Sequence, residues 1–278
     1  MRFIRLLRCD IQQGTLRRWY LYGIAFLFGL VVCIGAVREW NAFHLLDENR
    51  ITAGNCMVVY FQGAEQYIPS PDQPFQLPLD WMLLTFFPVC LIGDYVVRDL
   101  KGMGQTTLLQ SGSRILWWSS KICWSVITAI MYGSVLLLSA VLVSAFAGSA
   151  SLIPNQTLLA IKLGDDFAMQ SVGKLLWSLY GLPFMVILTN CVIHLTLSLF
   201  LPPVYSAMLL LAVQVASVYY MAPFLPGEYV MLLRSDQSIQ NGFSSQTGTL
   251  LCTALIGLSL IVGKLRFCRY DILGKKEV

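Results

Sequence analysis

Residues 19–37 read WYLYGIAFLFGLVVCIGAV and contain no charge; Arg17 and Arg18 precede them and Arg38 follows. A run of about 18 apolar residues is long enough to cross the hydrocarbon core of a bilayer as a helix. This run is longer than the apolar part of a cleaved signal peptide and is not followed by a convincing small-residue cleavage site, so we expect it to be retained. It predicts a first transmembrane span.

The composition of the whole chain indicates that lipid is its solvent. Of the 278 residues, 56% are hydrophobic and 12% are charged, whereas a soluble globular domain is typically about 25% charged. Residues 122–161 carry no charge, and neither do the residues between Lys174 and Glu228. Such stretches are too long for a water-soluble core.

Six spans account for these stretches in an all-α membrane protein, because a segment in lipid has to satisfy its own backbone hydrogen bonds. Pro202 and Pro203 divide the longest stretch into two helices. The predicted spans cover residues 19–37, 81–97, 117–147, 175–201, 204–222 and 247–263. The external loops then cover residues 38–80, 148–174 and 222–246, and residues 1–278 form a single transmembrane domain.

The basic residues predict how the chain is threaded through the membrane. With both termini on one side, that side receives 14 of the 19 basic residues and 5 of the 15 acidic ones. Its net charge is then +9, and that of the opposite side is −5. Basic residues near span ends stay in the cytoplasm, so we expect cytoplasmic N and C termini and a multi-pass protein of the inner or plasma membrane.

The segment before the first span, residues 1–18, mixes apolar residues with arginines. Phe3, Leu7 and Ile11 share one stripe at a period of 3.6 residues, and Arg8 lies off it. This pattern favours a helix lying in the cytoplasmic interface of the membrane. The alternative is a basic flank that only orients the first span.

A charged, glycine-containing segment between the second and third spans, residues 98–121, is the best candidate for a functional site. It is longer than a hairpin needs, and residues 105–110 are compatible with a short helix after Gly102 and Gly104, which permit tight turns. Such a helix can dock in a groove of a cytosolic partner. The alternative is a connecting loop whose basic residues only determine topology.

The sequence GMGQTTLLQSGSRILWWSSK, residues 102–121, resembles the first cytoplasmic loop of type 2 ABC-transporter permeases. In that family a coupling helix in this loop contacts the ATPase, and a Ser-Arg pair precedes the third span. The proline-bearing segment from Pro223 to Arg234 resembles the family's last external segment, which often forms short helices. The resemblance implies an ATPase-coupling loop with the residues Asp99, Lys101, Gly102, Gly104, Gln105, Thr106, Leu108, Leu109 and Arg114.

The chain contains no G-x-x-x-x-G-K-[ST] motif, so it cannot cradle ATP phosphates in a P-loop. We therefore expect a transport subunit that is not itself an enzyme and binds no cofactor, with ATP and Mg on separate cytosolic ABC ATPase subunits. Six spans are half of the usual transporter, which implies a homodimer or a second permease subunit in contact with membrane lipids; no nucleic-acid partner is expected. The alternative is a secondary transporter or accessory membrane protein that works without an ATPase.

The apolar and aromatic spans favour a hydrophobic or amphipathic substrate over a small ion. The family resemblance implies export of an antimicrobial peptide, a lipid or a drug. Asp94, near the end of the second span, is expected to be hydrated or paired with Arg98, four residues later. A catalytic role for Asp94 needs a second carboxylate, or a nucleophile and a base, beside it. We expect no such arrangement, which argues against a membrane-embedded enzyme.

Four polar residues inside spans are costly in hydrocarbon and can mark a path. Asn190, His194 and Ser198 share one helix face at i, i+4 and i+8, and Gln214 lies midway along the next span. One interpretation is a proton or substrate relay. The other, which we favour, is interhelical hydrogen bonding that holds neighbouring spans together.

Overall fold

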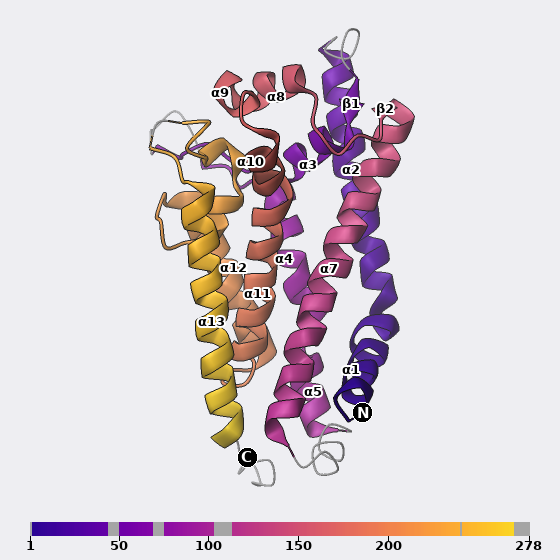
Figure 1. Cartoon of the computed structure of the whole chain (residues 1–278), viewed down its shortest axis with the longest axis vertical. Helices are drawn as coiled ribbons and strands as arrows, with labels where there is room; N and C mark the ends of the chain where they lie inside the picture. Colours follow the sequence, from indigo (N-terminus) through magenta and orange to yellow (C-terminus); the bar gives the residue numbers. More distant parts are fainter. Residues whose placement is uncertain (1, 44–49, 69–74, 103–112, 240, 270–278) are drawn as a thin grey trace.

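The computed structural model describes residues 2–43, 50–68, 75–102, 113–239 and 241–269, which form a bundle of long helices (Figure 1). Five helical segments are long and apolar enough to cross a membrane: Phe3–Ala42, Leu79–Lys101, Arg114–Ala147, Val172–Leu197 and Ser245–Cys268. The start of the first segment and the end of the last lie at the same end of the bundle (Figure 1).

The first long segment begins well before the predicted span. Helix α1 (Arg2–Asp10) continues through a π-helical turn (η1, Ile11–Thr15) and a 3-10 turn (η2, Leu16–Arg18) into α2 (Trp19–Ala42). The wide π turn places Gly14 against the ring of Trp124, where an added Cβ would lie 2.6 Å from ring carbons. The turn therefore allows close packing between the N-terminal segment and the third long helix.

The second segment is broken inside the predicted span 81–97. Helix α4 (Leu79–Ile92) ends at Gly93, whose φ of 50° is a conformation that side chains other than glycine's rarely adopt. A separate helix, α5 (Tyr95–Lys101), then continues to the end of the bundle where the chain starts. The sequence pattern predicted one uninterrupted span because an isolated glycine is also common inside membrane helices.

The third and fourth segments extend the predicted spans toward their N-terminal ends. Helix α7 (Arg114–Ala147) begins after Ser113, whose side chain accepts a hydrogen bond from Leu116 N. The fourth comprises α10 (Val172–Leu176), the π turn η3 (Trp177–Gly181) and α11 (Leu182–Leu197). Helix α11 ends four residues before the predicted position 201, in a turn that leads into Pro202.

The last two helices differ from their predicted spans in opposite ways. Helix α12 (Pro203–Tyr219) has 17 residues and ends where Tyr220 takes an extended conformation, three residues before the predicted end at 222. Helix α13 (Ser245–Arg269) has 25 residues and exceeds the predicted span 247–263 at both ends. Helix α11 packs extensively against α13 and also contacts α4, α7 and α12.

The three predicted external loops contain helices of their own. Helix α3 (Ala53–Phe61) is buried almost throughout and packs against α2 and α7. Its N-terminus carries a reciprocal capping box between Thr52 and Asn55. The other elements are the parallel strands β1 (Ile51–Thr52) and β2 (Gly148–Ser149), the helices α8 (Gln156–Leu163) and α9 (Asp165–Ala168), and the 3-10 turns η4 (Pro226–Val230) and η5 (Leu232–Arg234).

The buried apolar side chains form two clusters. The larger cluster lies around α3 and includes Trp40, Tyr60 and Tyr132. The smaller one joins α5, the first turns of α7 and the end of α13, with Trp117 stacked on Phe267 at 4.5 Å between ring centroids. The smaller core therefore holds together the helices on both sides of the predicted coupling loop.

Candidate functional site

A buried ion cluster lies where α1, α5 and α7 meet. The side chain of Lys121 is 1% exposed, and its ammonium contacts a carboxylate oxygen of Asp10 and, at 2.6 Å, one of Asp99. Both carboxylates are at most one-tenth exposed. One cation therefore bridges two acids, and the three groups come from three different helices.

Neutral groups complete the cluster. The Tyr95 hydroxyl donates to Asp10 Oδ1 at 2.8 Å, and the Ser120 hydroxyl donates to Asp10 Oδ2 at 2.5 Å. The Lys121 ammonium also lies over the rings of Tyr95 and Trp117, 4.5 and 4.8 Å from their centroids. Charge-assisted hydrogen bonds and cation–π contacts at a desolvated site favour one fixed arrangement of these helices.

The ion cluster anchors the residues that precede the predicted coupling loop, and Arg114 anchors those that follow it. Arg114 Nη1 donates to Cys268 O at 2.6 Å and to Phe267 O at 3.5 Å, at the last carbonyls of α13. A cation at a helix C-terminus is favoured by the helix dipole. The helices on both sides of the loop, α5 and α7, are thus tied to each other, to α1 through Asp10 and to α13 through Arg114.

The remaining predicted loop residues are placed less completely. Lys101 and Gly102 are exposed at the end of α5, where Gly102 N donates to Asp99 O at 3.0 Å. The residues that would form the coupling helix lie outside the described residues: Gly104, Gln105, Thr106, Leu108 and Leu109. Their role stays a prediction.

Asp94 pairs with Arg18 and not with Arg98. Arg18 Nη2 donates to Asp94 Oδ1 at 2.5 Å, and the carboxylate is more than half exposed, so it is also accessible to water. Asp94 and Arg98 do lie one helical turn apart, since Arg98 N donates to Asp94 O at 2.9 Å, but the Asp94 carboxylate contacts Arg18 of the N-terminal segment instead. This contact adds a second link between the N-terminal segment and the second long segment.

The four intramembrane polar residues do not form one connected path in the described structure. His194 Nδ1 lies 2.9 Å from Ser206 Oγ on α12, and its Nε2 lies 3.0 Å from Gly93 O. Gln214 Nε2 donates to Thr85 Oγ1 on α4 at 3.0 Å. Ser198 donates to Leu195 O in its own helix turn, and Asn190 is buried. The contacts of His194 and Gln214 join neighbouring helices, which is the arrangement that interhelical packing requires.

A second buried ion pair lies at the opposite end of the bundle. Arg234 Nη1 donates to Glu228 Oε2 at 2.9 Å, and both side chains are at most 1% exposed. The other four guanidinium N–H bonds go to backbone carbonyls, so that all five donors are used. The acceptors are Ala64 O, Glu65 O, Ser217 O and Val218 O, at 2.7–3.0 Å. Arg234 thereby fastens the segment after α12 to the end of α12 and to the loop after α3.

Burial raises the pKa of Glu228 from its ordinary value of 4.5 to about 7, against the opposing effect of Arg234. The folded protein then binds a proton on this group more readily than the unfolded chain does, so its contribution to stability is largest below pH 4.5. We expect the free energy of unfolding, relative to a Glu228→Gln variant, to fall by at most about 1.4 kcal/mol per pH unit as pH rises toward 7. Unfolding of both proteins across that range measures the slope; Asp80→Asn, an exposed acid, is the control, and a flat difference would contradict the expectation.

Sequence reasoning missed both buried ion pairs. It counted all four residues, Asp10, Lys121, Glu228 and Arg234, in the topology. It also placed the last three in segments that resemble the permease family, but it paired none of the four. One signal was present, since Asp10 is the single acidic residue among residues 1–18. Nothing in the spacing indicates that Asp10 meets Lys121, which lies 111 positions later.

Among the described residues, no group of three or more His, Cys, Asp or Glu side chains is arranged to hold a metal ion. In comparisons with known proteins, no family model, no curated protein and no solved structure matches the chain.

Proposed function

We propose that this chain is the membrane-spanning permease subunit of an ATP-driven exporter of the type 2 ABC class. Cytosolic ATPase subunits would bind ATP and Mg and would grip the loop between α5 and α7. The permease would pair with a second copy of itself or with a similar subunit. Its apolar helices favour a hydrophobic or amphipathic substrate, such as an antimicrobial peptide, a lipid or a drug.

The arrangement of the helix ends supports a topology in which both termini lie on the side of the coupling loop. The start of α1, the end of α5, the start of α7 and the end of α13 all lie at one end of the bundle (Figure 1). With α12 counted as a sixth span, the chain crosses an even number of times and both termini are cytoplasmic. The basic flanks then obey the positive-inside rule, and α1 enters the membrane interface next to the coupling loop.

The proposal depends on one observation: Lys121 forms an ion pair that joins the helices on the two sides of the loop. Asp99 precedes the loop and Lys121 follows it, and their ion pair joins α5 to α7 and, through Asp10, to the N-terminal segment. A force applied to the loop by a partner would therefore act on three helices together rather than on one. A permease that a separate ATPase switches between two conformations needs such rigid transmission of force.

Replacing Gln105–Leu109 by five glycines is expected to uncouple the chain from its ATPase without preventing membrane insertion. Glycines remove the apolar side chains and disfavour a short helix. The tagged full-length chain would be purified from the membranes of its natural host, and ATP hydrolysis that copurifies with it would be measured. We expect the variant to lose most of this activity.

A control variant tests whether any replacement at the proposed cytoplasmic end of the bundle has the same effect as the loop variant. Residues 270–273, replaced by glycines, lie on the same proposed side and should leave the copurifying activity unchanged. Equal retention of the ATPase by the loop variant would contradict the coupling role. Substrate export by the purified chain without any ATPase would instead indicate a secondary transporter.

A further inference from the structure

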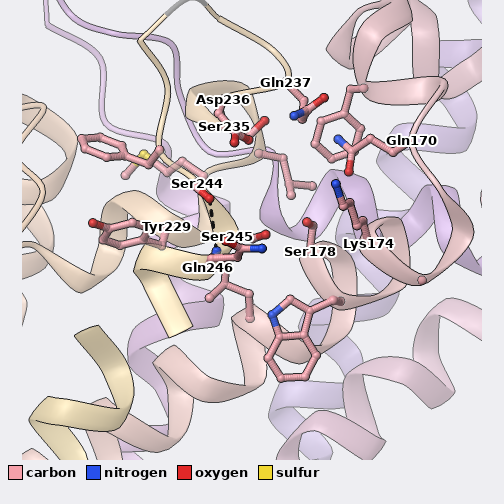
Figure 2. A pocket seen from close by; sticks show the side chains of 17 residues that line it. Gln170, Lys174, Ser178, Tyr229, Ser235, Asp236, Gln237, Ser244, Ser245 and Gln246 are labelled. Carbon is pink, nitrogen blue, oxygen red and sulfur yellow. Dashed lines mark hydrogen bonds between the residues drawn. The ribbon is translucent and has the colours of Figure 1, made fainter. Parts of the chain in front are cut away.

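A pocket of about 430 Å³ lies at the end of the bundle opposite the proposed coupling loop. It is bounded by the start of the fourth long segment on one side and by the residues that precede and begin α13 on the other. Figure 2 shows Gln170, Lys174 and Ser178 on one wall and Ser235, Asp236 and Ser244 facing them. A cavity of this size, with a few convergent polar groups, has the general form of a small-ligand site.

The two charges of the pocket are left for a ligand. Lys174 and Asp236 are both exposed, and neither makes an ion pair within 4 Å with any part of the chain that the structure describes. With opposite charges on facing walls, a ligand that carries a single charge is attracted by one wall and repelled by the other. They attract a molecule that carries an anion at one end and a cation at the other.

The wall that holds Lys174 is suited to an anion. The side-chain nitrogen of Gln170 is buried and has no hydrogen-bond partner among the described residues, so this amide gains a hydrogen bond if it turns toward a ligand in the pocket. A buried donor without an acceptor costs free energy, which a ligand oxygen would recover. The N-terminus of the 25-residue helix α13 also opens onto the pocket through Ser245 and Gln246, and its dipole adds positive potential.

A tryptophan near the start of a membrane-length helix lines the pocket. This residue, Trp177, has a 43% exposed indole that donates to Thr249 Oγ1 at 3.1 Å. Tryptophan at a span end is typical of the membrane interface. Val172, in the first turn of the same helix, is 50% exposed, so apolar surface adjoins the pocket.

We propose that this pocket binds a phosphate ester that also carries an amine, as in the headgroup of phosphatidylethanolamine. Lys174 and Gln170 would hold the phosphate oxygens, and Asp236 would hold the ammonium group. The interfacial position favours a lipid over a soluble source of the same chemistry. The proposal requires no ATPase, so it stands or falls independently of the function proposed above.

The test is native mass spectrometry of the detergent-purified full-length chain, titrated separately with phosphatidylethanolamine and phosphatidylglycerol. Lys174→Gln should weaken binding of both lipids about tenfold or more, because both carry the phosphate. Asp236→Asn should weaken binding of phosphatidylethanolamine by a similar factor, because only this lipid has an ammonium group. The same variant should not weaken binding of phosphatidylglycerol, whose phosphate the Asp236 carboxylate repels. Lys162→Gln and Asp165→Asn, at exposed or part-exposed positions of α8 and α9, should change neither affinity.

Soluble competitors distinguish the sources of the ligand. Free phosphoethanolamine that displaces the lipid only at much higher concentration supports a lipid site. Equal affinity for free phosphoethanolamine would keep the phosphate and amine chemistry but overturn the lipid assignment. Displacement by glycylglycine but not by phosphoethanolamine would overturn the proposal in favour of a peptide site, and unchanged lipid affinity in both pocket variants would overturn it altogether.

Discussion

Replacing Arg234 by methionine is expected to lower the free energy of unfolding by about 3–5 kcal/mol. The substitution leaves the Glu228 carboxylate buried at 0% exposure without its cation. It also removes the donors from four backbone carbonyls, two of them at the C-terminal end of α12. Thermal or denaturant unfolding of the purified full-length chain in detergent would measure the change.

A second substitution separates the charge effect from the loss of the carbonyl contacts. Arg234→Met combined with Glu228→Leu removes the unpaired carboxylate, so it should recover part of the lost stability but not all of it. Arg38→Met replaces an exposed arginine at the outer end of α2 and should change stability by less than about 0.5 kcal/mol. A single Arg234→Met variant as stable as the Arg38 control would show that the ion pair contributes nothing measurable.

Lys121→Met is the second change with a large expected effect, again about 3–5 kcal/mol of lost stability. It strands two carboxylates, those of Asp10 and Asp99, in a place where water barely reaches. The matched control is Lys101→Met at the same end of the bundle, where the lysine is exposed. Unfolding of both variants measures the difference between a bridging lysine and a solvated one.

Replacing the two partner acids by neutral asparagines should restore stability to the Lys121→Met variant. With Asp10→Asn and Asp99→Asn added, no unpaired charge remains, and most of the stability should return. A triple variant that regains stability still lacks the ion pair between α5 and α7, so it can report separately on the proposed coupling to an ATPase. Failure of the triple variant to recover stability would mean that the cluster acts through packing rather than charge.

Much of the helical architecture follows from local pattern. Long charge-free runs predicted the positions of the membrane-length helices, because lipid excludes unpaired charges over any contiguous stretch. The helix ends were harder to predict. The break at Gly93 depends on a left-handed backbone conformation, and the early start of α7 depends on the cap at Ser113; neither changes the average hydropathy of its surroundings.

The ion pairs could not be predicted because they join residues that are distant in sequence. Periodicity and composition describe one helix at a time, whereas Lys121 meets Asp10 only after three helices have packed. Helix α3 was missed for a different reason. With nine residues it is too short to register as a span, and its burial against α2 and α7 is a tertiary property.

The bridging role of Lys121 also restricts how this sequence can evolve. A single mutation at position 10, 99 or 121 leaves a buried charge with fewer partners, and the resulting intermediate is less stable than either the starting pair or a fully neutral set. Descendants of this chain can therefore depart from Asp-Asp-Lys only by crossing a fitness valley or by changing positions together. Among related sequences, these three positions should therefore vary as one correlated unit.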